Sequence, residues 1–187
     1  MNSTRANHDP VREWVIKDTN SEISLNTSYP KIIETILISR GIIDEDVIEA
    51  FLKPALKALG DPFALPQMSK AVDRVLGAID KKENIVVYGD YDVDGVTSLT
   101  MMKKVLGAYD NVAITFMPHR IDDGYGLSIS ALKHCIDKHS PSLIVAVDCG
   151  TTSIKEIDWL NESGIDSVIL DHHEPLSEGL PLSLIHI

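Results

Sequence analysis

The 187-residue sequence has few of the features that mark secreted, membrane or nucleic-acid-coating proteins. It has two cysteines, so nothing suggests a framework of disulfide bonds. No apolar run approaches the roughly 20 residues that a transmembrane helix needs, and the polar N-terminus has no signal-peptide pattern. Lysine and arginine number 17 against 28 acidic residues, which argues against a protein that coats nucleic acid. With 44% apolar residues the chain can still bury a core, and we expect a cytoplasmic protein.

The strongest pattern lies at residues 85–95. An apolar, β-branched run predicts a buried strand, and that strand ends at three carboxylates spaced two residues apart: Asp90, Asp92 and Asp94. Like charges this close repel one another, so a bound cation is the natural compensation. Carboxylate oxygens suit hard or borderline divalent ions such as Mg²⁺ or Mn²⁺.

Two simpler interpretations of the acidic stretch are less favoured. As a calcium-binding EF-hand loop it would need a glutamate at its twelfth position, where Met101 stands, and a helix rather than a strand before it. As an acidic turn that sits in water it would not need the hydrophobic strand that leads straight into it.

The chain divides into four parts. A polar arm is expected at 1–29, with Trp14 and its apolar neighbours as an anchor, and a helical lead-in at 30–81. An α/β domain follows at 82–181. The last six residues, 182–187, fit no expected element and resemble the translation of a sequencing-library transposon adapter, so we expect a non-native tail.

Strands and helices alternate in the α/β part, which predicts a mainly parallel sheet flanked by helices. The expected strands are residues 85–88, 112–116, 143–147 and 167–170, and the expected helices between them are 96–106, 128–136 and 154–160. In such a sheet the carboxyl ends of the strands share one edge. That edge should gather the residues that follow the first, third and fourth strands: Asp90, Asp92, Asp94, Asp148, His172 and His173.

Four motifs, in order, resemble those of the DHH phosphoesterases, and among these the RecJ single-strand-specific exonucleases. They are Gly-Asp-Tyr-Asp-Val-Asp-Gly at 89–95, a stretch at 118–127 that ends in Asp-Gly-Tyr-Gly-Leu, Val-Asp-Cys-Gly at 147–150 and Asp-His-His at 171–173. The helical lead-in is similar as well, and the likeness covers about residues 30–175. Four motifs at domain-scale spacing are far more specific than the Asp-His-His triplet alone.

The resemblance implies a Rossmann-like phosphoesterase domain that hydrolyses phosphodiesters with two divalent ions, Mn²⁺ or Mg²⁺, about 4 Å apart. It implies five metal ligands: Asp90, Asp92, Asp94, Asp148 and His172. His173 would face the substrate phosphate, and Asp171 would orient a histidine. It further implies degradation of single-stranded DNA from the 5′ end in repair and recombination, with a helicase and a single-strand-binding protein as candidate partners.

Four other residues near these motifs have more than one interpretation. His119 and Arg120 are candidates to contact a substrate phosphate, although a loop arginine often forms only a surface ion pair. Cys149 is expected to pack as a small buried side chain. Tyr91 either stacks on a base or fills space beside the strand.

The likeness stops short of a whole exonuclease. A complete domain of this family supplies a further acidic ligand on a later strand, and RecJ proteins continue into a DHHA1 domain and an OB-fold. None of these is found in the sequence. We therefore expect a truncated fragment that is inactive or nearly so on its own.

Three alternatives remain open. A DHH phosphodiesterase for oligoribonucleotides or cyclic dinucleotides typically has a histidine several residues before its first aspartate pair, and this chain has none. A haloacid-dehalogenase-like phosphatase would use Asp92 as a nucleophile, but it leaves the motif at 171–173 unexplained. A metal- or nucleic-acid-binding module without catalysis is the third.

Overall fold

The computed structural model describes residues 24–25, 27–109, 113–119, 124, 126–177, 179–181 and 185–186. The chain forms two compact units, Met1–Leu59 and Gly60–Ile187. Most of the expected polar arm, including Trp14, lies outside the described residues.

The first unit is helical. It contains α1 (Lys31–Ser39), α2 (Glu45–Leu52) and the short 3₁₀ helix η1 (Leu56–Ala58). Gly41, with a φ of 74°, ends α1. The N–H of the next residue, Ile42, donates to the carbonyl of Leu37 and closes this helix end. The Asp44 carboxylate accepts from the N–H groups of Asp46 and Val47 and so caps α2.

The second unit contains a parallel sheet, and the predicted α/β fold class is confirmed. Its strands are β1 (Ile85–Gly89), β2 (Ile114–Phe116), β3 (Leu143–Val147), β4 (Asp166–Leu170) and β5 (Ile185–His186). They lie in the order β2-β1-β3-β4-β5, and every pairing is parallel. Tyr88 on β1 lies opposite Phe116 on β2 and Ala146 on β3.

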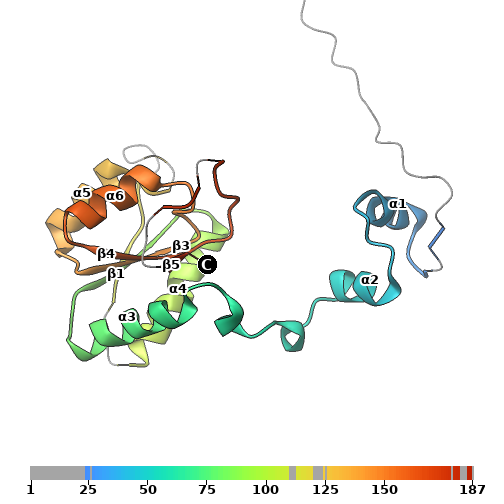
Figure 1. Ribbon diagram of the computed structural model, residues 1–187, viewed down its shortest axis with the longest axis horizontal. Coiled ribbons are helices and arrows are strands. Elements are labelled where there is room, and N and C mark those ends of the chain that lie inside the picture. The colour runs from blue at the N-terminus through green and yellow to red at the C-terminus, as the bar shows by residue number, and fades with distance from the viewer. Residues whose placement is uncertain are drawn as a thin grey trace, which may run out of the picture. The chain divides into compact units, whose positions relative to one another are not determined.

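Helices cover both faces of the sheet (Figure 1). The second unit contains η2 (Pro62–Ala64), α3 (Met68–Asp80), α4 (Val93–Gly107), α5 (Ile129–His139) and α6 (Ile154–Glu162). Val86 and Tyr88 pack with α5 and α6, whereas Ile85 and Val87 pack with α3 and α4. Because neighbouring residues of a strand point to opposite faces, a strand buried on both sides reads as a continuous apolar run.

The expected helical region at 30–81 is shared between the two units. Its third helix, α3, packs on the sheet through Ala71 and Ala78 and so belongs with the α/β part. The tail also differs from the expectation that it fits no element, because Ile185–His186 pairs with β4 as a fifth strand. The backbone groups at the open edge of β4 can form hydrogen bonds with any extended chain, so this pairing requires no particular sequence pattern.

Among the described residues, no helix is both long enough and apolar enough to cross a bilayer.

Candidate metal centre

The candidate site lies where the order of the strands reverses. β2 lies on one side of β1 and β3 on the other, so the segments that follow β1 and β3 leave the sheet in opposite directions. In open parallel sheets ligands bind in the crevice that this divergence opens, at the carboxyl ends of the strands. Asp90 follows β1, Asp148 follows β3 and Asp171 follows β4.

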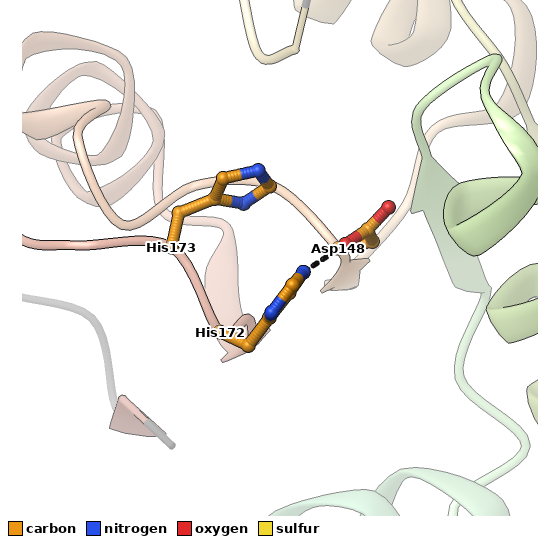
Figure 2. A group of neighbouring side chains, drawn as sticks. All are labelled: Asp148, His172 and His173. Atoms are coloured by element: carbon orange, nitrogen blue, oxygen red, sulfur yellow. Dashed lines mark ion pairs between the residues drawn. The ribbon is translucent and has the colours of Figure 1, made fainter. Parts of the chain in front are cut away.

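Asp148, His172 and His173 form a group of possible metal ligands within the described part of the chain. One ligand atom from each lies within 4.8 Å of the others. Nε2 of His172 is 3.2 Å from Oδ1 of Asp148, and Figure 2 shows the His172 ring aimed at that carboxylate with His173 beside it. The Asp148 side chain is buried, whereas both imidazoles are exposed. A cation here would meet one carboxylate and two aromatic nitrogens.

Asp148 occupies an unusual backbone conformation. Its φ is 59°, in the left-handed region that aspartate tolerates better than most residues. Its N–H donates to the carbonyl of Leu170, which extends the pairing with β4 by one residue before the chain turns away. Burial raises the pKa of Asp148, and the negative charge of Asp92 raises it further. A nearby cation would remove both penalties on the charged carboxylate.

Asp171 is a buried acceptor that organises the segment after β4. Its Oδ1 accepts from the backbone N–H groups of His172 and His173 and lies 2.7 Å from Nδ1 of His173. Its Oδ2 accepts from the N–H of Thr151 at 2.9 Å. Burial by itself would raise the pKa of Asp171, but the hydrogen bonds from Thr151 and His173 lower it to about 2. The pKa of His173 is raised by its contact with Asp171.

Asp90 and Asp92 lie on either side of the turn between β1 and α4. Asp90 is fully buried; its Oδ1 accepts from the N–H of Tyr91, and its Oδ2 has no hydrogen-bond partner in the described part of the chain. Asp92 caps α4 by accepting from the N–H of Gly95 at 3.0 Å. This contact lowers the pKa of Asp92 and is the reason why α4 begins at Val93 rather than at the predicted residue 96.

The other predicted site residues are not in this group. Asp94 is exposed in the first turn of α4. His119 is exposed three residues after β2, and Arg120 lies outside the described residues. Cys149 is buried as predicted, and burial raises the pKa of its thiol.

Two residues that shape the site were not predicted from the sequence. Thr151 acts on Asp171 through its backbone N–H, a group that every residue except proline carries, so its identity held no signal. Gly95 packs against the main chain of Asp90, where a Cβ would overlap the Asp90 carbonyl. The glycine that follows three spaced aspartates was visible in the sequence, but its close approach to one of them was not.

Two hollows flank the cluster. One, of about 590 Å³, contains Asp148, Asp171 and His173 together with Glu156 and Glu174. The other, of about 280 Å³, is lined by Ser98, Asp148, Leu170, Asp171 and His172. The described lining residues of both include acidic side chains and neither lysine nor arginine. An anionic ligand would be repelled from this surface unless a cation came first.

Comparisons with known proteins agree with this geometry. Residues 84–184 match the family described as "DHH family, N-terminal domain". The chain is 35% identical over 144 residues to the single-stranded-DNA-specific exonuclease RecJ of Bacillus subtilis, covering 77% of this chain and 18% of that protein. It is 32% identical over 162 residues to RecJ of Dickeya dadantii, covering 86% of this chain and 27% of that protein. The chain thus spans about a quarter or less of the length of these relatives.

Solved structures of similar proteins contain manganese. A crystal structure of exonuclease RecJ bound to manganese superposes with a TM-score of 0.59 at 30% identity, covering 65% of this chain and 31% of that chain. RecJ from Thermus thermophilus in complex with Mn²⁺ superposes with a TM-score of 0.58 at 26% identity, covering 80% of this chain and 20% of that chain. The resemblance read from the four sequence motifs is therefore confirmed, and this chain belongs to the DHH family.

Proposed function

We propose that this chain forms the metal-binding part of an exonuclease that degrades single-stranded DNA from its 5′ end, and that the intact domain binds two divalent ions. The observation that carries the proposal is the meeting of Asp148, His172 and His173, which offer ligand atoms within 4.8 Å of one another at the sheet edge. The names of the similar proteins supply the substrate class, and the manganese in their structures supports a divalent cation.

The proposed ligands are Asp90, Asp92, Asp94, Asp148 and His172. The residues fit such ions on a direct observation: Oδ2 of Asp90 and Oδ2 of Asp148 are buried and have no hydrogen-bond partner in the described part of the chain. A buried, unsatisfied carboxylate oxygen costs free energy that a cation would recover. The combination of aspartate oxygens with an imidazole nitrogen favours Mn²⁺ over Ca²⁺.

When bound, the ions would activate a water molecule and stabilise charge on the scissile phosphate. The chain's own contribution is to hold the ligands. Asp171 accepts from Nδ1 of His173, which leaves Nε2 of that ring available to face the substrate phosphate. The β3 and β4 ends are tied by the bond from Asp148 N–H to Leu170, so Asp148 and the two histidines follow directly after adjacent, hydrogen-bonded strands.

Further parts of the proposal rest on the family resemblance. Arg120 and His119 are proposed to contact a substrate phosphate, and the reaction is proposed to serve DNA repair and recombination in the cytoplasm. A helicase and a single-strand-binding protein are the proposed partners. The 187-residue chain by itself is proposed to be inactive or nearly so.

Calorimetric titration of the chain with Mn²⁺ tests the metal site. We expect saturable binding that Asp148→Asn weakens at least about tenfold, because the replacement removes a ligand charge. Asp158→Asn, an exposed residue of α6, is the matched control and should bind Mn²⁺ as the unaltered chain does. Equal binding by both variants would remove Asp148 from the site.

A nuclease assay separates the substrate classes. A 5′-phosphorylated single-stranded DNA and a diribonucleotide are incubated with the chain and Mn²⁺, and mononucleotide release is measured. Cleavage of the dinucleotide alone would favour the oligoribonucleotide phosphodiesterase. Robust release of mononucleotides from DNA would support the exonuclease and overturn the proposal that the chain alone is inactive.

A further inference from the structure

Helix α4 carries three hydroxyl side chains, and one of them differs from the others. Oγ1 of Thr97 donates to the carbonyl of Val93, and Oγ1 of Thr100 donates to the carbonyl of Val96, both at 2.8 Å. A backbone carbonyl of the preceding turn is the usual hydrogen-bond acceptor for a hydroxyl inside a helix. In the described part of the chain the hydroxyl of Ser98 makes no such bond and has no other hydrogen-bond partner.

Ser98 also lies on the side of α4 that meets the candidate metal centre. It lines the hollow of about 280 Å³ together with Asp148, Leu170, Asp171 and His172. Thr100 lines a different hollow, beside Lys103 and Phe116. The one hydroxyl of α4 without a partner among the described residues is thus the one next to Asp148 and His172.

The chemistry of this hollow leaves a role for a neutral donor. Ionised carboxylates accept hydrogen bonds and do not donate them, so Asp148 and Asp171 offer nothing to a phosphate oxygen. The Nε2 atom of His172 is directed at Asp148. Among the described residues that line this hollow, Ser98 carries the one side-chain donor that does not depend on a titratable group.

We propose that Ser98 is a substrate-binding residue whose hydroxyl donates a hydrogen bond to a non-bridging oxygen of the phosphate that occupies the metal centre. This inference rests on the proposed function, because it needs a phosphate beside Asp148 and His172. It adds a neutral donor from α4 to a hollow in which the aspartates are acceptors. The ligand it recognises is the phosphate of a nucleotide and not the base.

The test measures phosphate binding to the Mn²⁺-loaded chain. dTMP and ribose 5-phosphate are titrated by calorimetry into the unaltered chain, Ser98→Ala, Ser98→Thr and Thr100→Ala. Since a hydrogen bond to a charged group is worth more than a neutral one, we expect Ser98→Ala to weaken both ligands about five- to tenfold. Ser98→Thr keeps a hydroxyl and should retain most of the affinity, and Thr100→Ala should retain all of it.

The outcomes separate this inference from the proposed function. If the unaltered chain fails to bind Mn²⁺, or binds dTMP equally well without it, the proposed function is wrong. If binding is Mn²⁺-dependent but Ser98→Ala binds both ligands as the unaltered chain does, only the role of Ser98 is wrong. Loss of dTMP affinity with unchanged ribose 5-phosphate affinity would assign Ser98 to the base and overturn the phosphate contact. Circular dichroism checks that each variant keeps its helices, as alanine in a helix should.

Discussion

Nδ1 of His173 lies 2.7 Å from Oδ1 of Asp171, and this contact sets the state of the imidazole. A carboxylate with a pKa lowered to about 2 is an acceptor at neutral pH, so Nδ1 carries the hydrogen and Nε2 remains for a ligand. The Asp171 side chain is 1% exposed, which keeps water from competing for the contact. Asp171 therefore acts on the candidate centre by holding the segment that carries His172 and His173.

Replacing Asp171 tests this positioning role. Asp171→Asn keeps the shape of the side chain but removes the charge that holds the backbone N–H of the proposed ligand His172, and outer partners of this kind are typically worth about 10–100-fold in metal affinity. We expect Mn²⁺ affinity to fall by that factor in a calorimetric titration. Asp137→Asn, at an exposed position of α5, serves as the control. Unchanged Mn²⁺ affinity in Asp171→Asn would show that His172 needs no such support.

Two glycines of α4 should respond oppositely to the same substitution. A Cβ at Gly95 would overlap the Asp90 carbonyl, whereas a Cβ at Gly107 would meet nothing within 4 Å. Gly95→Ala should thus lower the free energy of unfolding and weaken Mn²⁺ binding, because Asp90 and Asp92 must move apart. Gly107→Ala should be neutral or stabilise the chain by up to about 1 kcal/mol, the helix-propensity difference between the two residues.

Urea unfolding and Mn²⁺ titration of both variants measure the two effects. Equal unfolding midpoints for the two variants would mean that α4 can shift away from Asp90 at little cost. In that case the close approach of Gly95 is not what holds the two carboxylates together.

The fold could be predicted because its signals are local. Continuous apolar runs such as residues 143–147 mark strands buried on both faces, and residue types that favour helix N-caps, Asp44 and Ser128, stand directly before their helices. The convergence of Asp148 with His172 follows from one topological fact, that parallel strands end at a shared edge. It needed no knowledge of the distance between the strands in sequence.

What could not be predicted depends on backbone contacts. The N–H of Thr151 reaches Asp171 from a loop whose path no residue type dictates. The pairing of Ile185–His186 with β4 likewise uses only backbone groups. The hydroxyl of Ser98, unpaired among the described residues, could not be distinguished from that of Thr97 in the sequence, because the sequence does not show which side of α4 faces the sheet edge.

Arg74 connects elements at the amino ends of the strands, whereas the candidate centre lies at their carboxyl ends. Its guanidinium lies 2.6 Å from Asp166 at the start of β4 and 2.7 Å from Glu83 just before β1. Arg74→Met would leave two carboxylates unpaired. Because the Arg74 and Glu83 side chains are 20% exposed and Asp166 is 48% exposed, solvent screening keeps the expected loss to about 1–2 kcal/mol of unfolding free energy.

Urea unfolding at low and high salt checks this prediction. The loss should shrink in about 1 M NaCl, where exposed charges are screened over about 3 Å. Lys70→Met, an exposed lysine of the same helix without a recorded ion pair among the described residues, controls for the change of a basic residue to methionine. A loss that does not depend on salt would assign the effect to packing of the arginine stem instead.

Glu34 in α1 gives the first unit a predictable response to acid. Its carboxylate accepts from the hydroxyl of Thr27 at 2.7 Å, and this bond lowers the pKa of Glu34 below 4.5. A lowered pKa in the folded state means that the carboxylate stabilises this unit above pH 4.5, and that the stabilisation is lost as the pH falls through the folded-state pKa. Thr27→Val removes the donor and should move the pKa of Glu34 upward.

Carbon-detected NMR of the side-chain carboxyl measures the Glu34 titration directly. Thr35→Val is the matched control, because the hydroxyl of Thr35 donates to the carbonyl of Lys31 and not to Glu34. We expect the Glu34 titration to shift in Thr27→Val and to stay in place in Thr35→Val. If both variants titrate like the unaltered chain, the second contact of Glu34, with Lys31 at 3.4 Å, must be what holds its pKa down, and Lys31→Met should then release it.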